Sequence, residues 1–122
     1  MQKKPILEKE VEAYLNKKAA KAGRQSYKFT SPQRRSVPDR LILGDIERVK
    51  ELLRDLLDAD MYLSDIAEAV MAEAITFIEC KRPGGQPTEA QTREHEKLRA
   101  RGFRVLVVDS KEMVDELYGK GK

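Results

Sequence analysis

A single run of apolar residues, "FRVLVVD" at residues 103–109, sets the fold class of this chain. Its length and its β-branched and aromatic members are typical of a strand that is buried on both faces of a sheet. A second run, "ITFIECK" at residues 75–81, also has strand character, and a helical pattern at 88–101 lies between the two. The chain therefore predicts an α/β fold in which helices pack on a central sheet.

The remaining patterns predict the order of the elements. Helices are expected where apolar residues recur at intervals of three and four, and short alternating runs are expected to be strands. In chain order we expect a helix at 7–22, strands at 26–30 and 39–43, two helices within 45–74, a strand at 75–81, a helix at 88–101, a strand at 103–109 and a helix at 111–118. This order predicts a mixed sheet flanked by helices, with a helical hairpin between the second and third strands.

Length and charge limit the organisation of the chain and its partners. At 122 residues it has room for one domain with one core. The segment 45–74 holds nine acidic and three basic side chains, a net charge of −6, whereas the rest of the chain carries +9. A basic body suits a polyanionic partner, and the acidic segment argues against a role in gripping one.

The single cysteine and the N-terminal sequence indicate the compartment. Because Cys80 is the only cysteine, an intramolecular disulfide is excluded and a reducing compartment is expected. The start "MQKKPILEKE" lacks the apolar stretch of a signal peptide, and no apolar run approaches the roughly 18 residues that span a bilayer. We therefore expect a cytoplasmic protein with no membrane partner.

The tripeptide "ECK" places Glu79 and Lys81 on one face of a strand, because side chains alternate between faces. Alone, a Glu-x-Lys is usually an ordinary ion pair at a strand end. If the strand that starts in "SVPDRLIL" pairs with residues 75–81, however, the carboxylates of Asp39 and Glu79 converge beside Lys81. A hard divalent ion such as Mg²⁺ takes oxygen ligands of this kind, and the Cys80 carbonyl could add another. Lysine can then orient a water or offset charge in a transition state.

These residues resemble a known family. A Pro-Asp pair followed by Glu-x-Lys is the signature of the PD-(D/E)XK nuclease superfamily. Together, "VPDRL", "ECKRPGG" and a glutamine six residues beyond the second glycine resemble the VRR-NUC domain, the virus-type replication-repair nuclease. The similarity spans nearly the whole chain, so residues 1–122 are expected to form one domain with a restriction-endonuclease-like core. The chain departs from the pattern at Ser36, where a glycine commonly precedes "VPD", and in an insert at about 44–74.

The resemblance implies hydrolysis of DNA phosphodiester bonds with Mg²⁺ or Mn²⁺, in DNA repair or recombination in a bacterial or phage-infected cell. Stand-alone viral members are homodimers that resolve four-way (Holliday) junctions, so branched DNA is the expected substrate and a homodimer the expected assembly. The number of metal ions stays open. Two alternatives also stay open: a DNA-binding module with an inactive nuclease fold, and a flap or other structure-specific nuclease.

The family's site residues can be carried onto this chain one by one. Asp39 and Glu79 match the metal-binding acids, with the Cys80 carbonyl as a further ligand, and Lys81 matches the catalytic lysine. Glu8 matches a glutamate of the first helix, although Glu10 and Glu12 compete for that role because all three acids lie near the start of the helix. The residues expected to hold phosphates are Arg24, Lys28, Arg34, Arg35, Arg40 and Arg82.

Gln91 matches the family's glutamine in the helix after the core strand and is counted with the catalytic residues. It also completes "TEAQ", a capping box in which Thr88 caps the helix and Gln91 bonds back, and both roles can hold together. His95 shares the helix face of Gln91 one turn later, and such a residue is more often in packing or in solvent than in a site.

The two helices expected within 45–74 each carry an apolar stripe and an acidic outer face. Helices this short are not stable alone and must bury their stripes against something. The hairpin could buttress the domain, shield one side of the cleft or extend a dimer interface. We favour the dimer interface, because an acidic surface is repelled by phosphates and should pack away from DNA.

Overall fold

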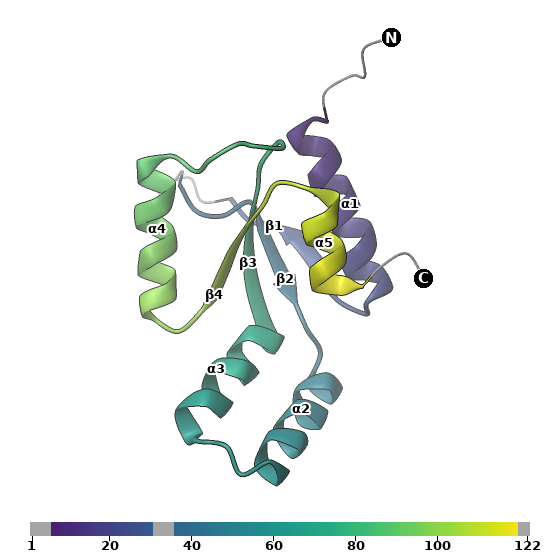
Figure 1. The fold of residues 1–122 in the computed structure, drawn as a ribbon, viewed down its shortest axis with the longest axis vertical. Helices are drawn as coiled ribbons and strands as arrows, with labels where there is room; N and C mark the ends of the chain where they lie inside the picture. The colour runs from purple at the N-terminus through teal and green to yellow at the C-terminus, as the bar shows by residue number, and fades with distance from the viewer. Residues whose placement is uncertain (1–5, 31–35, 120–122) are drawn as a thin grey trace.

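The structure, a computed structural model, describes residues 6–30 and 36–119, and its elements follow the order expected from the sequence (Figure 1). They are α1 (Glu8–Lys21), β1 (Gln25–Lys28), β2 (Arg40–Leu43), α2 (Ile46–Asp58), α3 (Leu63–Ala74), β3 (Ile75–Cys80), α4 (Glu89–Ala100), β4 (Arg104–Val108) and α5 (Lys111–Tyr118). The expected α/β class is confirmed. No helix among the described residues has the length and apolar character needed to cross a membrane.

The strands of the described residues form one mixed sheet in the order β1-β2-β3-β4. The pairs β1–β2 and β2–β3 are antiparallel, whereas β3 and β4 are parallel and are connected through α4. β3 is the most buried strand, since all its residues after Ile75 are buried. Its central place explains why this segment of the sequence is rich in apolar and β-branched residues.

The helices cover the two faces of the sheet unequally. Figure 1 shows α1 and α5 together on one side of the sheet and α4 on the other. The main core lies under α1 and α5, and its buried members are Val11, Leu15, Ala19, Ile42, Ile78, Cys80, Val108 and Val114. Residues 78 and 80 of β3 therefore face α1, and the alternation of side chains turns Phe77 and Glu79 toward the α4 face.

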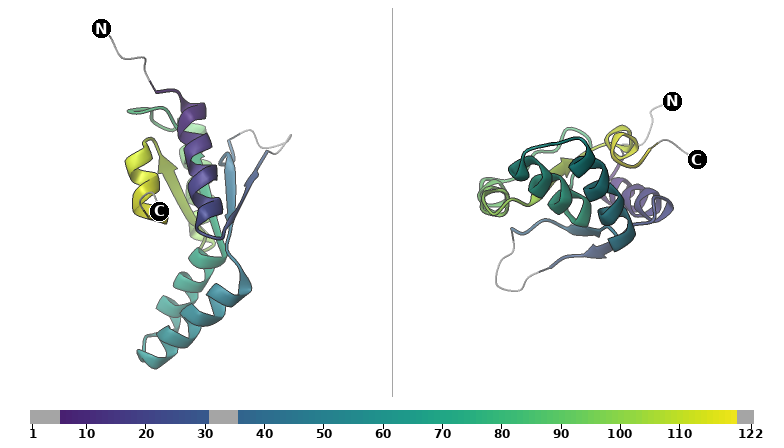
Figure 2. Two further views of the ribbon diagram at one scale, coloured as in Figure 1. Left: turned by 90° about the vertical axis from the view of Figure 1, so that its right-hand side faces the viewer. Right: turned by 90° about the horizontal axis from the view of Figure 1, so that it is seen from below.

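The hairpin of α2 and α3 extends beyond one end of the sheet (Figure 2). It joins the end of β2 to the start of β3, where the Gly44 N–H donates to the Ala74 carbonyl at 3.0 Å. The two chain segments pass so closely that a Cβ added at Gly44 would lie 2.1 Å from the carbonyl oxygen of Glu73. A glycine is therefore required at this junction.

Arg24 fastens the base of the hairpin to the rest of the domain. Its Nη2 bonds both carboxylate oxygens of Glu73, at 2.8 and 2.7 Å, and its Nη1 donates to the Glu73 carbonyl at 3.2 Å. The guanidinium also lies over the ring of Tyr118, 5.6 Å from its centroid. The planar guanidinium thus uses one nitrogen for the carboxylate and the other for the backbone carbonyl, so Arg24 is committed to the fold.

The outer part of the hairpin keeps apolar side chains in solvent. No residue of α2, which the structure describes in full, is buried. Around the tip, Leu57 is 61% exposed, Tyr62 82% and Leu63 81%. The stripe expected from the sequence therefore exists, and the described part of the chain leaves much of it uncovered.

Candidate active site

The pairing of β2 with β3 brings Asp39 beside Glu79. Arg40 lies opposite Ile78, so the preceding residue of β2 meets the following residue of β3. Residues opposite each other in a sheet point to the same face, which here is the face of α4. The Asp39 carbonyl also accepts from the Phe29 N–H at 2.7 Å, so β1 helps to hold the backbone of Asp39. The two acids that the sequence suggested are thus side by side.

The backbone of Cys80 completes this end of β3. Its N–H donates to Oδ2 of Asp39 at 2.8 Å. The register continued from Arg40 and Ile78 places Cys80 opposite Pro38, which is buried and has no N–H to donate. The proline therefore interrupts the hydrogen bonding between β2 and β3 at this point. The Asp39 side chain accepts the hydrogen bond of the Cys80 N–H. Pro38 offers no N–H to the Cys80 carbonyl. The thiol lies on the other face, where burial and the charge of Asp39 raise its pKa.

Glu79 is the most strongly perturbed carboxyl of the described residues. Only 1% of it is exposed. Burial, followed by the charge of Asp39 and a side-chain hydrogen bond with Asp39, raises the pKa of Glu79 to about 8, while Lys81 acts to lower it and Glu8 to raise it. Two carboxylates forced together in this way favour a proton or a cation between them.

Lys81 follows Glu79 at the end of β3, and its own N–H donates to the Val108 carbonyl at 2.9 Å. This bond continues the β3–β4 pairing beyond Cys80 and fixes the backbone of Lys81. The ammonium acts on the pKa values of both Glu79 and His95, so its charge lies close to the acids. The expected grouping of Asp39, Glu79 and Lys81 is therefore present in space.

His95 of α4 contacts this group. Its Nε2 lies 3.2 Å from Oε1 of Glu79, and each of the two side chains is only 2% exposed. Burial, aided by Arg99 and Lys81, lowers the pKa of His95. The sequence indicated that His95 shares a helix face with Gln91, but which surface that face would meet depends on how α4 packs. The contact with Glu79 was therefore missed.

The three glutamates of α1 have different partners. Glu10 accepts from the Leu7 N–H at 2.9 Å and caps the helix, and Glu12 accepts from Nε of Arg40 at 2.8 Å. Glu8 is exposed at the start of α1 and acts on the pKa of Glu79. Within the described part of the chain, Glu8 is the one of the three whose carboxylate makes no such bond and still acts on the pKa of Glu79.

Gln91 forms the capping box expected from "TEAQ". The Thr88 N–H donates to Oε1 of Gln91 at 2.9 Å, and the Gln91 N–H donates to Oγ1 of Thr88 at 3.1 Å. The capping box fixes the first turn of α4, the helix that carries His95.

The basic residues expected to hold phosphates are distributed differently from the acids. Lys28 pairs with Arg40 in the sheet, and both belong to the face of α1, where Arg40 is tied to Glu12. Arg82 is exposed next to Lys81, at the same end of the sheet as Asp39 and Glu79. Arg34 and Arg35 lie outside the described residues.

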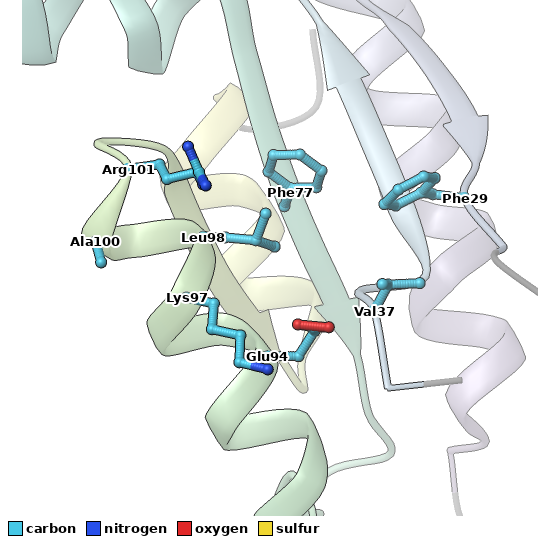
Figure 3. A pocket seen from close by; sticks show the side chains of 8 residues that line it. All are labelled: Phe29, Val37, Phe77, Glu94, Lys97, Leu98, Ala100 and Arg101. Carbon is cyan, nitrogen blue, oxygen red and sulfur yellow. The ribbon is translucent and has the colours of Figure 1, made fainter. Parts of the chain in front are cut away.

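A hollow of about 680 Å³ lies on the α4 face beside the acids (Figure 3). Its sheet side is apolar, with the rings of Phe29 and Phe77 5.8 Å apart between centroids, and Glu94 of α4 adds a carboxylate to the lining. Lys97 and Arg101 line it from α4, and neither was singled out from the sequence. They stand four residues apart on a helix whose inner face only the structure identifies, which is why they were missed.

Among the described residues, no group of three or more His, Cys, Asp or Glu side chains is arranged to hold a metal ion. The available oxygen donors are instead two carboxylates and a main-chain carbonyl, from Asp39, Glu79 and Cys80. Magnesium accepts such a partial set, because it commonly keeps several waters and binds through one or two carboxylates. The donor set therefore fits a hard divalent cation.

A mixed sheet with paired acids and a Glu-x-Lys at one end defines the PD-(D/E)XK class of nuclease domains. The chain is 36% identical over 108 residues to "Putative nuclease p44" of Acyrthosiphon pisum secondary endosymbiont phage 1, covering 88% of each chain. A solved structure described as a VRR_NUC domain matches with a TM-score of 0.66 and 25% identity, covering 94% of this chain and 97% of that one. A scan against protein-family models gave no match. The chain belongs to the VRR-NUC nuclease family.

Proposed function

We propose that this protein is a divalent-metal-dependent, structure-selective DNA endonuclease that cuts branched DNA, with the four-way junction as its substrate. The observation that carries the proposal is the convergence of Asp39 and Glu79 next to Lys81, in a chain of a nuclease family. The phage origin of the relative supports a place of action in the cytoplasm of a bacterial host, where phage DNA recombines and is repaired.

Asp39, Glu79 and the Cys80 carbonyl are proposed to hold Mg²⁺ or Mn²⁺, with Glu8 assisting. The raised pKa of Glu79 supports this role, because a group of acids that cannot all ionise alone becomes ionised when a cation joins it. When bound, the cation makes a water a better nucleophile and offsets charge at the scissile phosphate.

Lys81 is proposed to hold the attacking water and to stabilise the charge that develops on the phosphate. Its charge acts on the pKa values of both Glu79 and His95, so the ammonium lies near both side chains. A compact ammonium with three donors suits both tasks. Gln91 is proposed to add a polar contact with substrate from α4 while its carbonyl oxygen caps the helix.

The DNA backbone is proposed to run over the α4 face. Arg82, Lys97 and Arg101 would hold phosphates there, because Arg82 is next to the site and the other two line the adjoining hollow. Lys28, Arg34, Arg35 and Arg40 remain proposed contacts from the sequence. Arg40 is the weakest of the described ones, since Glu12 already neutralises it.

A second copy of the chain is proposed to pack on the hairpin. Leu57, Tyr62 and Leu63 present apolar surface that the chain itself leaves exposed. Two sites related by a two-fold axis would make paired incisions in a symmetric junction.

The decisive experiment compares cleavage of a four-way junction, a flap and a linear duplex with Mg²⁺, with Mn²⁺ and with EDTA. We expect metal-dependent cutting of the junction in preference to the duplex. Lys81→Ala and Asp39→Asn should each reduce cleavage by at least about 100-fold while leaving junction binding nearly unchanged, because the basic surface is intact. Binding without metal-dependent cutting by the wild type would favour the inactive nuclease fold, and preferential flap cutting would favour the flap nuclease.

A further inference from the structure

The contact between His95 and Glu79 joins two side chains that are both almost fully buried, with 3.2 Å between Nε2 and Oε1. They come from different elements, α4 and β3, so that neither local helix geometry nor strand pairing produces the contact. A buried polar pair of this kind contributes to the fold only when its hydrogen bonding is satisfied.

The two oxygens of the Glu79 carboxyl stand in different surroundings. Oε1 faces His95. The carboxyl also shares a side-chain hydrogen bond with Asp39 and lies near the charge of Lys81. Oε1 is therefore in contact with His95 of α4, and the carboxyl group also faces Asp39.

We propose that His95 is a positioning residue, whose Nε2–H donates to Oε1 of Glu79 and fixes the carboxylate so that Oε2 serves a divalent cation. An ionised carboxylate is an acceptor only, so the bond to it requires the proton on Nε2. The inference rests on the proposed metal-dependent function, but it concerns how the acid is held and not the cleavage step.

Several features of α4 support the role. The capping box of Thr88 and Gln91 fixes the start of the helix, and Nη2 of Arg99 donates to the Val105 carbonyl at 2.7 Å one turn beyond His95. The start of the helix is thereby fixed, and the Arg99 bond ties the helix to β4 one turn beyond the imidazole. Side chains that orient a metal ligand through hydrogen bonds typically change metal affinity by about 10–100-fold when they are removed.

The first test measures the affinity for Mn²⁺ alone, without DNA, by the electron paramagnetic resonance signal of the free ion. His95→Met keeps the approximate length and apolar character of the side chain but removes the donor, and we expect its Kd to rise by about 10–100-fold. His95→Gln keeps an N–H donor and should stay close to wild type. Leu98→Met is the matched control on the same helix, since Leu98 lines the hollow and is not bonded to Glu79.

The effect should pass through Glu79. In a Glu79→Gln background, His95→Met is expected to cause no further loss of Mn²⁺ affinity, because the ligand that it positions is already changed. Folded His95→Met protein with the Mn²⁺ affinity of the wild type overturns the inference and leaves the proposed function standing. A wild type that binds no Mn²⁺ overturns both.

The second test needs no variant. His95 is the only histidine of the chain, so ¹⁵N-labelled wild-type protein gives one pair of imidazole nitrogen signals. With MgCl₂ added we expect Nε2 to carry the proton and Nδ1 to be unprotonated. A Mg²⁺-bound state in which Nε2 lacks a proton overturns the inference, even if the Met variant fails to fold.

Discussion

Glu79 receives opposing influences from four neighbouring groups, and its behaviour therefore reports on the whole site. Asp39 and Glu8 oppose its ionisation, Lys81 favours it, and His95 contacts one of its oxygens. In the metal-free protein this arrangement disfavours the ionised form of Glu79, which becomes more populated as pH rises.

The raised pKa of Glu79 predicts that the stability of the metal-free protein, measured in EDTA, depends on pH. The pKa of Glu79 is about 8 in the folded chain against an ordinary value of 4.5, so its stabilising contribution is present at low pH and is lost as pH rises toward 8. The lowered pKa of His95 acts in the opposite sense only as pH falls through its ordinary value of 6.5. Between about 6.5 and 8 the wild type should lose stability as pH rises.

Thermal melts of wild type and Glu79→Gln over that window provide the measurement. Glu79→Gln should show a flatter profile, because the amide does not titrate. Identical slopes for the two proteins would contradict the assignment of the raised pKa to Glu79.

The identity of the candidate site residues could be predicted from the sequence, but their partners could not. The alternation of side chains placed Glu79 and Lys81 on one face, and the Pro-Asp start of β2 suggested which acid would meet them. Whether Arg40 would meet a phosphate or Glu12 depended on the placement of α1 across the sheet. The same holds for His95, since a helix has several faces and the sequence does not say which one the sheet meets.

At the scale of the elements, the β2–β3 pair connects two ends of the molecule with different characters. One end carries Asp39 and Glu79, and the other carries the hairpin of α2 and α3. Helix existence and order were predictable from apolar periodicity. The direction of the hairpin was not, because it is set by the close passage at Gly44 and by Arg24, which are long-range contacts. The structure puts the hairpin at the end of β3 away from the acids, which removes the support for a role in shielding the cleft (Figure 1).

Arg24→Met should loosen the base of the hairpin. The substitution keeps much of the apolar stem but removes the hydrogen bonds to Glu73, and the expected loss is about 1–3 kcal/mol in the free energy of unfolding. Lys50→Met is the matched control, because Lys50 makes an exposed pair with Glu47 at 3.3 Å and such pairs contribute about 0.5 kcal/mol or less. Urea unfolding measures both, and equal losses would argue against a clamp at Arg24.

At the scale of the whole molecule, charge is divided between the hairpin and the body. The segment 45–74 has a net charge of −6 and the remainder +9. Phosphates should therefore be held by the body, far from the hairpin, with an affinity that falls steeply as salt is added.

Lys97→Ala with Arg101→Ala should flatten the dependence of log Kd on log salt, by roughly 0.9 for each phosphate contact removed. Arg48→Ala with Arg54→Ala removes the same charge from α2 and should leave the slope unchanged. Fluorescence anisotropy with a labelled junction gives both slopes. If the two double variants have the same slope, the α4 face is not the phosphate track.

The hairpin should be needed for dimerisation. Leu57→Ser with Leu63→Ser makes its exposed tip polar while both helices remain, and we expect a monomer that nicks a junction but no longer makes paired cuts. Light scattering measures the mass. An unchanged dimer would exclude the tip from the interface and leave the buttress role for the hairpin.

The meeting of Gly44 with Ala74 has a consequence for how such domains diversify. The chain leaves the sheet and returns to it at adjacent positions of an antiparallel pair, so the segment between them can be shortened, lengthened or exchanged with little effect on the register of β2 and β3. Related chains could therefore acquire different assemblies by grafting at this one position. The chemistry at the opposite end of the same two strands would be inherited without change.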